Sequence, residues 1–162
     1  MLQWSSPQAM ANTDTVMASV DLLTVPEKVI SALITDEVER WWGSSETYRM
    51  TGWSADPRVG GSWSVTVRTA DGRWLPASGK FLEIEMSRRI VQTRRYGWDH
   101  PTLGRHETTL AYLLEPVAAG TRLIVCHGGF AGFPDAAAEH AYGWARVLGW
   151  LQGYLGEGMK AV

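Results

Sequence analysis

Polar side chains interrupt an otherwise apolar face on two neighbouring runs of the sequence. In the run 121–127, alternation puts Leu123, Val125 and His127 on one side of an extended chain. The matching face of the preceding run holds His106, Thr108, Leu110, Tyr112 and Leu114. Histidine, threonine and tyrosine donate or accept hydrogen bonds, and histidine changes its charge near neutral pH. A ligand cavity is mostly apolar with a few fixed polar groups, so the two runs predict a binding site.

A third run, 89–96, extends the polar row when the runs are paired as antiparallel strands. Pairing the first two runs about their turn sets Leu110 opposite His127, and pairing the third sets Arg94 opposite Thr108. The residues added to the shared face are Gln92, Arg94 and Tyr96. The polar end of the predicted cavity is therefore built from three strands.

Arg94 needs an anionic partner, because an isolated buried charge is costly. The partner is either a ligand group or a carboxylate of the protein, for which Glu83 is the candidate if it faces inward. The predicted ligand-binding residues are Trp63, Phe81, Gln92, Arg94, Tyr96, His106, Thr108, Tyr112, His127, His140 and Trp144. The competing interpretation is structural: these side chains satisfy one another or reach solvent at the open end.

Other chemistries find less support in the residue spacing. His106, His127 and His140 could in principle form a three-histidine zinc site, but no tight ligand spacing indicates one. Cys126 faces opposite to His127 along the strand, so the two do not form a nucleophilic pair. We therefore expect no metal, no cofactor and no catalytic residue.

Composition narrows the class of protein further. The chain has 162 residues and a formal net charge of -2, which disfavours nucleic-acid binding because that requires a basic face. No stretch approaches the ~20 apolar residues of a membrane span, and no secretory signal is recognisable. One cysteine cannot form an internal disulfide, so a cytoplasmic location is expected. Residues 1–12 are expected to form a flexible tail, and 13–162 a single domain.

Periodicity predicts the elements that position these residues. A first strand covers 15–25, and two short helices follow at 26–34 and 36–42. Further strands are predicted at 48–55, 62–68, 74–85, 89–96, 106–114 and 121–127. A long amphipathic helix covers 135–155, with an apolar stripe through Trp144, Leu148 and Leu151. The pattern predicts an α+β fold in which six to seven antiparallel strands curl around the long C-terminal helix.

This order of elements, together with several local motifs, resembles the helix-grip fold of the START-like superfamily. The chain is similar to single-domain bacterial members of the activator of heat-shock protein 90 ATPase homologue family. The motifs that carry the resemblance are Trp41-Trp42, 56–63, Asp71-Gly72, 79–84, 89–91, Glu115-Pro116, 120–123, 127–130 and Gly143-Trp144 with Leu148 and Leu151. The chain departs from the family where relatives often carry tryptophan and this sequence has Arg94. A second departure is Asp21-Leu22-Leu23, where relatives often have an arginine.

Three functions remain open at this stage. The first is a binding protein for a small hydrophobic or amphipathic ligand, including an anionic one. The resemblance implies a second, a protein–protein module of the co-chaperone type with a role in stress response, and Trp41 and Trp42 would suit a partner or homodimer surface. The third is an enzyme like START-like cyclases and aromatases, with Arg94, His127 and Tyr112 as acid–base candidates.

Overall fold

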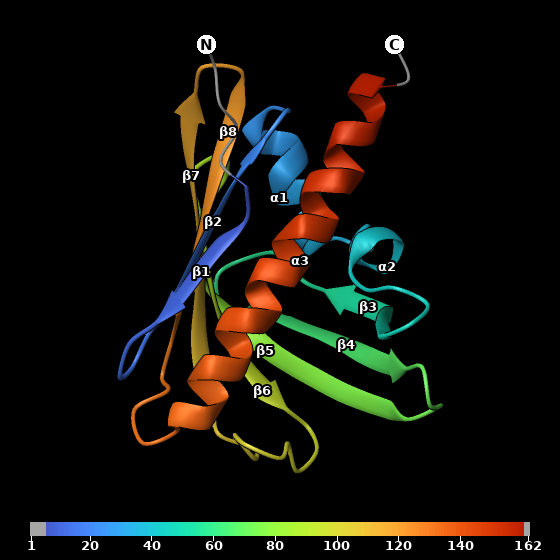
Figure 1. Cartoon of the computed structure of the whole chain (residues 1–162), viewed down its shortest axis with the longest axis vertical. Coiled ribbons are helices and arrows are strands. Elements are labelled where there is room, and N and C mark those ends of the chain that lie inside the picture. The colour runs from blue at the N-terminus through green and yellow to red at the C-terminus, as the bar shows by residue number, and fades with distance from the viewer. Residues whose placement is uncertain (1–5, 161–162) are drawn as a thin grey trace.

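The computed structural model describes residues 6–160 as one antiparallel sheet that curls around a long helix (Figure 1). The strands are β1 (Gln8–Ala11), β2 (Val16–Leu22), β3 (Tyr48–Ala55), β4 (Ser62–Thr69), β5 (Trp74–Glu85), β6 (Arg89–Tyr96), β7 (Thr108–Val117) and β8 (Gly120–Gly128). The helices are α1 (Pro26–Ile34), α2 (Val38–Trp41) and α3 (Pro134–Lys160). This is the predicted helix-grip architecture.

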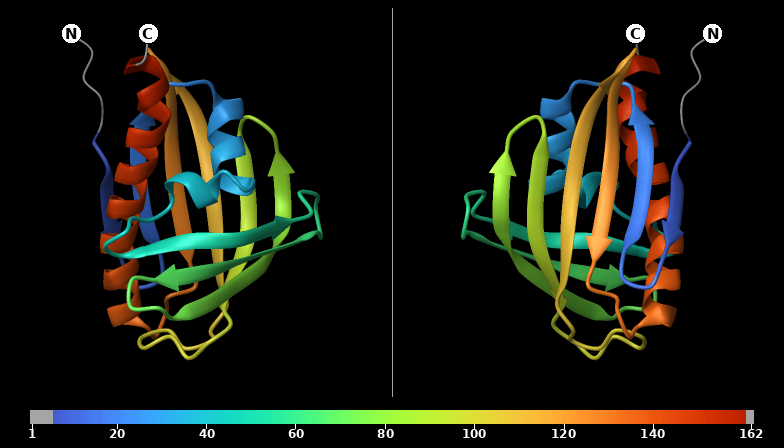
Figure 2. Two further views of the ribbon diagram at one scale, coloured as in Figure 1. Left: turned by 90° about the vertical axis from the view of Figure 1, so that its right-hand side faces the viewer. Right: turned by 90° about the vertical axis from the view of Figure 1, so that its left-hand side faces the viewer.

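The sheet contains eight strands in the order β1-β2-β8-β7-β6-β5-β4-β3, one more than the largest number predicted. The additional strand is β1, which pairs with β2 from Gln8 opposite Ser19 to Ala11 opposite Val16. It lies inside the segment that the sequence predicted to be a flexible tail, whose first five residues are outside the described chain. Figure 2 shows β3 and β4 running across the direction of the other strands, and β5 bending from one direction into the other, so the sheet closes around one face of α3.

The two short helices are set by local sequence. Pro26 opens α1, where its missing N–H is not needed. The α2 helix is shorter than the predicted 36–42 segment and leads into Gly43, whose φ of 125° favours glycine. The indole N–H of Trp41 donates to the carbonyl of Ala32 at 2.9 Å and ties α2 to α1.

Trp41 and Trp42 are buried, with 4% and 6% of their surface exposed. Their rings stack on each other with centroids 5.1 Å apart, and Trp42 meets the ring of Trp144 edge-on at 5.7 Å. Their burial supports the interpretation that the pair packs the short helix, and it contradicts the alternative of a partner or homodimer surface. Trp42 packs on Trp144 of α3, and Trp41 bonds to Ala32 of α1.

The predicted apolar stripe of α3 anchors the helix across β2 and β1. Leu148 and Leu151 are fully buried, and Trp144 and Val147 are 3% and 4% exposed. Because α3 packs on the β1–β2 end of the sheet, its opposite flank faces the curled strands β3, β4 and β5 (Figures 1 and 2). Among residues 6–160, no helix is long and apolar enough to cross a membrane.

Candidate ligand-binding cavity

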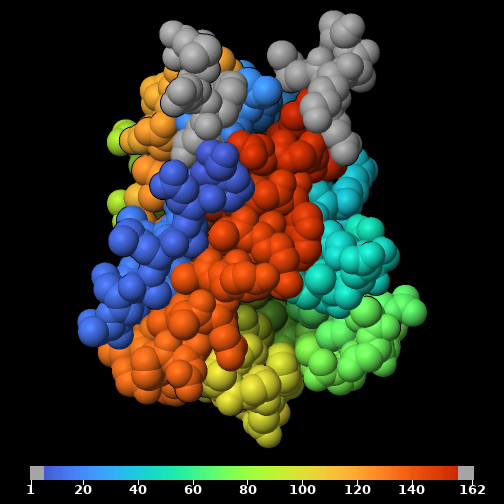
Figure 3. Space-filling model, viewed as in Figure 1, coloured from blue at the N-terminus to red at the C-terminus, as the bar shows by residue number. Residues whose placement is uncertain are grey.

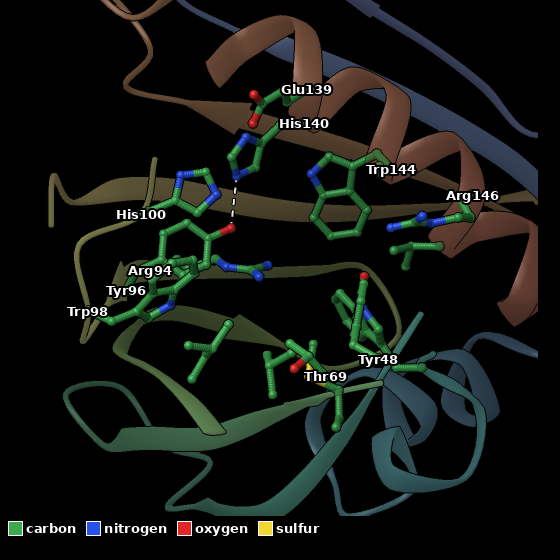
Figure 4. A pocket seen from close by; sticks show the side chains of 16 residues that line it. Tyr48, Thr69, Arg94, Tyr96, Trp98, His100, Glu139, His140, Trp144 and Arg146 are labelled. Carbon is green, nitrogen blue, oxygen red and sulfur yellow. Dashed lines mark hydrogen bonds between the residues drawn. The ribbon is translucent and has the colours of Figure 1, made fainter. Parts of the chain in front are cut away.

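A cavity of about 280 Å³ lies between the free flank of α3 and the curled half of the sheet. Figure 3 shows the hollow at the molecular surface, bordered by α3, α2, the β6–β7 loop (97–107) and the β3–β5 strands. Its walls, drawn in Figure 4, are formed by Trp42, Tyr48, Met50, Val67, Thr69, Leu75, Arg94, Tyr96, Trp98, His100, Glu139, His140, Gly143, Trp144, Arg146 and Val147. The lining combines aromatic rings with a few charged and polar groups, as ligand sites do.

The strand register that places the polar row agrees with the prediction. Arg94 is paired with Thr108, and Leu110 with both Gln92 and His127. Alternation then turns these side chains toward α3, because one face of each strand is buried. The register was predictable because a slip of one residue would turn the apolar residues of a strand outward.

His127 is fully buried at the centre of this row and is held by two hydrogen bonds. The indole N–H of Trp144 donates to His127 Nδ1 at 3.0 Å, so Nδ1 is an acceptor. The proton of the neutral ring is therefore on Nε2, which lies 2.8 Å from Thr108 Oγ1. Thr108 in turn donates to the carbonyl of Arg94 at 3.4 Å, so this chain of hydrogen bonds satisfies His127 structurally.

His140 forms a second hydrogen-bonded pair, on the cavity wall itself. Its Nδ1 lies 2.7 Å from the carbonyl of Ala136, one turn earlier in α3, and must donate to it. The Tyr96 hydroxyl is 2.9 Å from His140 Nε2 and donates to it when the ring is neutral (Figure 4). His100 stacks on the other side of the pair, with its ring 4.5 Å from that of Tyr96.

The histidines around the cavity are held in the neutral form. Burial, reinforced by the charge of Arg94 and by His100, lowers the pKa of His140 to about 4. Burial and the Arg94 charge also hold the pKa of His127 well below 6.5. Burial also lowers the pKa of His100, although the negative charge of Glu139 opposes this shift. Near neutral pH the positive charge of the cavity therefore comes from its arginines.

Arg94 reaches the cavity and has no carboxylate partner among residues 6–160. Its guanidinium lies 5.4 Å from the Tyr96 ring centre and 6.0 Å from that of Trp42. Glu83, the partner considered from sequence, is exposed and pairs with Arg89 at 3.0 Å instead. The cause is a register shift in β5 between Phe81 and Glu83, which interrupts the alternation and leaves Glu83 on the outer surface.

A second, much smaller chamber of about 20 Å³ adjoins the cavity behind Arg94. Trp42, Met50 and Arg94 are walls of both spaces. The other walls of the chamber are Leu33, Val38, Trp53, Trp63, Val65, Gln92, Leu110 and Tyr112. Its volume corresponds to about one water-sized group.

Four buried side-chain atoms in the described chain lack a hydrogen-bond partner: Trp42 Nε1, Gln92 Oε1, Arg94 Nε and Arg146 Nε. All four belong to residues that line the cavity or the chamber. Buried polar groups in native proteins are nearly always paired, and each exception calls for an explanation. Their concentration around one pair of connected spaces indicates a place where a polar ligand group would complete the hydrogen bonding.

The residues predicted from sequence fall into three groups. Arg94, Tyr96, His140 and Trp144 line the larger cavity, and Trp63, Gln92 and Tyr112 line the small chamber. Thr108, His127 and Phe81 are buried beside these spaces without lining them. His106 lies elsewhere, because β7 begins only at Thr108: its Nε2 contacts the carbonyl of Gly129 at 2.9 Å, and its ring stacks on Phe133.

Sequence reasoning missed the wall that closes the mouth. Trp98 and His100 come from the β6–β7 loop, and Tyr48, Glu139 and Arg146 from β3 and α3. The loop is fixed by His100, whose Nδ1 accepts from the backbone N–H groups of Thr102 and Leu103. The available signal was the tryptophan in this loop, because tryptophan is on average a highly buried residue.

The histidines do not converge on a metal. His106 lies outside the cavity, and His127 directs both ring nitrogens to Trp144 and Thr108. Across residues 6–160, no cluster of three or more histidine, cysteine or acidic side chains has an arrangement that could hold a metal ion.

The curled antiparallel sheet, the long C-terminal helix and the cavity between them define a helix-grip protein of the START-like class. The chain belongs to the family described as Activator of Hsp90 ATPase homolog 1-like protein, whose model matches residues 24–156. No curated protein matches the chain.

Solved structures share this fold at low sequence identity. A protein from Rhodobacter sphaeroides is 20% identical over 94% of this chain and 99% of its own, with a TM-score of 0.79. A family member from Silicibacter pomeroyi is 21% identical over 89% and 99%, with a TM-score of 0.73. DynU16, a protein in the dynemicin biosynthetic locus, is 22% identical over 91% of this chain and 49% of its own, with a TM-score of 0.71.

Proposed function

We propose that the protein binds a small amphipathic molecule in the cavity beneath α3. The observation that carries the proposal is the convergence of four unpartnered buried polar atoms on the cavity and its chamber. Leaving such a group unpaired costs roughly 1–3 kcal/mol, and more when it is charged. A ligand with a polar end would recover that free energy, while its apolar part would cover the aromatic walls.

The cavity volume limits the size of the ligand. A cavity of roughly 150 Å³ accommodates one benzene ring, so about 280 Å³ suits a molecule of about two rings. Tyr48, Trp98 and Trp144 provide flat apolar walls for such a molecule. This size excludes long-chain lipids as fully enclosed ligands.

The experiment is a binding screen with two matched variants. Trp42, Trp98 and Trp144 line the cavity, so binding should change tryptophan fluorescence and raise the melting temperature. Gly143→Leu fills the cavity, since a side chain at Gly143 meets open space there. Gly153→Leu is the control, because Gly153 is exposed on the same helix away from both spaces.

Wild type and the Gly153 variant should bind the same molecules, and the Gly143 variant should bind them at least tenfold more weakly. A broad panel of two-ring amphipathic molecules with no effect on the wild type would refute the proposal. Equal binding by the Gly143 variant would place the site elsewhere and would also refute it.

A second candidate is acid–base catalysis on the bound molecule, favoured by the Tyr96–His140 hydrogen bond on the cavity wall. Tyr96 can take a proton from a carbon acid while passing its own to His140, and Arg94 would stabilise the enolate that forms. The low pKa of His140 makes it a weak base, so binding remains the first proposal.

Deuterium exchange at an acidic C–H of a bound ligand would test the catalytic candidate. Tyr96→Phe should abolish the exchange while binding persists, and exchange that persists in this variant would exclude the Tyr96–His140 pair.

A further inference from the structure

Two of the four unpartnered atoms, Trp42 Nε1 and Arg94 Nε, belong to residues that wall both the cavity and the small chamber. We infer that the ligand is an aromatic carboxylate whose acid group is held at the junction of these two spaces by Arg94, with the indole N–H of Trp42 as a second donor. The inference rests on the proposed function and adds the chemical class of the ligand. Trp42 and Arg94 are walls of both spaces, and Gln92 closes the chamber side.

The donors at the junction select an acceptor with negative charge. The indole of Trp42 and the guanidinium of Arg94 only donate hydrogen bonds, and the amide of Gln92 can donate or accept. Within the described residues, Arg94 and Arg146 form no ion pair with a protein carboxylate. Glu139 is the acidic residue among those that line the cavity. It is exposed, and its carboxylate accepts a hydrogen bond from the Thr102 hydroxyl at 2.9 Å. The charge of Arg94 is therefore left for a ligand.

The shape of the junction favours carboxylate over phosphate. Arg94 can bind a carboxylate side-on through Nε and a terminal nitrogen, a planar two-bond arrangement. The guanidinium carbon lies 6.0 Å from the Trp42 ring centre and 5.4 Å from that of Tyr96, so both aromatic rings adjoin the charged group. The chamber behind it has room for about one oxygen-sized group, which suits a single carboxylate oxygen and is too small for a whole tetrahedral phosphoryl group.

The cavity also offers aromatic walls for the rings of an aromatic carboxylate and a second positive charge, that of Arg146. The Trp42 and Trp144 rings stand edge-on, 5.7 Å apart, beside the path from the junction to the mouth. Figure 4 shows Arg94 and Arg146 extending toward the cavity from different sides, one from β6 and one from α3. Arg146 lies over the rings of Tyr48 and Trp150, at 5.5 and 5.1 Å, and adds positive potential that attracts an anion.

The test compares naphthoate with its neutral amide, naphthamide, by titration calorimetry. The two probes have the same rings and nearly the same size, so their difference in affinity reports the charge. Wild type should bind naphthoate at least tenfold more tightly than naphthamide, as a two-bond charged contact implies. Arg94→Met should remove that preference, and naphthyl phosphate should bind more weakly than naphthoate to the wild type.

Arg89→Met is the matched control, because Arg89 is an exposed arginine of the same strand that pairs with Glu83 at the surface. It should keep the naphthoate preference. Arg94→Lys is the second variant in case the methionine variant does not fold; it keeps the charge and loses the two-bond geometry, so the preference should fall without vanishing.

The outcomes separate the two levels of the proposal. Equal affinity of wild type for naphthoate and naphthamide would overturn the carboxylate inference and leave the binding function standing. A tighter complex with naphthyl phosphate, or an unchanged preference in both Arg94 variants, would overturn it too. If neither probe nor any two-ring molecule of the screen binds, the proposed function falls and the inference falls with it.

Discussion

The indole N–H of Trp144 on α3 donates to Nδ1 of His127 on β8 over 3.0 Å, with both side chains buried. This bond joins the helix to the sheet directly beneath the cavity. Because the indole is a donor only, it also determines which nitrogen of His127 carries the proton.

Trp144→Phe should therefore destabilise the protein. Phenylalanine keeps an aromatic ring in place, but His127 Nδ1 loses its partner inside the core, which costs about 1–3 kcal/mol. Urea unfolding should show this loss in the free energy of unfolding. Trp74→Phe is the control, since Trp74 is 58% exposed and its replacement should change stability by less than about 0.5 kcal/mol. Equal stability of both variants would contradict the importance of the bond.

Stability should fall as the pH drops from 6.5 toward 4. The pKa of His140 is lowered from 6.5 to about 4, so in this window the unfolded chain binds a proton that the folded chain does not. The free energy of unfolding therefore rises with pH in this window. The contribution of His140 is complete above pH 6.5, and up to about 3 kcal/mol is lost as the pH falls to 4, at 1.36 kcal/mol per pH unit. The lowered pKa of His127 acts in the same direction.

Urea midpoints at pH 7, 6 and 5 measure this dependence. His140→Gln removes one titrating group and should make the curve less steep, while the contribution of His127 remains. A wild-type curve that is flat between pH 7 and 5 would show that His140 is not held neutral by burial.

Tyr96→Phe should raise the pKa of His140. The Tyr96 hydroxyl donates to Nε2 of the neutral imidazole and so stabilises the uncharged form. A hydrogen bond of about 1 kcal/mol corresponds to a rise of somewhat less than one pH unit. NMR titration of the His140 ring would measure it, with Tyr154→Phe as control because the Tyr154 hydroxyl donates to Glu37 instead. A fall in the pKa would contradict the assigned direction of the bond.

Gly43→Ala should damage the cavity wall through the backbone. At a φ of 125°, an added Cβ would lie 1.9 Å from the carbonyl oxygen of Tyr48. Relieving this clash must move Trp42 or Tyr48, both of which line the cavity, and we expect a loss of more than about 2 kcal/mol of stability. Gly72→Ala has a similar φ of 88° with nothing within 4 Å, so it should cost only about 1 kcal/mol of backbone strain. Comparable thermal unfolding of the two variants would argue against the clash.

Most of the sheet could be predicted from the sequence because alternation and turn chemistry act locally. The bounds of β3, β5 and β6 match the predicted runs, and Leu114 lies opposite Leu123 as the turn requires. The predicted helix-grip architecture and the family are confirmed. Each strand buries one face with a period of two residues, and this leaves the pairing register little freedom.

What could not be predicted depends on contacts between distant segments. The four-residue strand β1 has no pattern of its own and is held by pairing with β2 and by contact with α3. The outward position of Glu83 follows from a shift in β5 that alternation alone cannot reveal. Trp98 and His100 belong to a loop, whose path no periodicity describes, although they close the mouth of the cavity.

Different residues of α3 anchor the helix and line the cavity. Leu148 and Leu151 anchor the helix in the core and face neither cavity, whereas Glu139, Gly143 and Arg146 face the larger one. Substitutions at Glu139, Gly143 and Arg146 can therefore change the cavity lining without touching Leu148 and Leu151. Trp144 and Val147 serve both roles, because they are buried in the core and also line the cavity. The solved structures that share this fold do so at about 20% sequence identity.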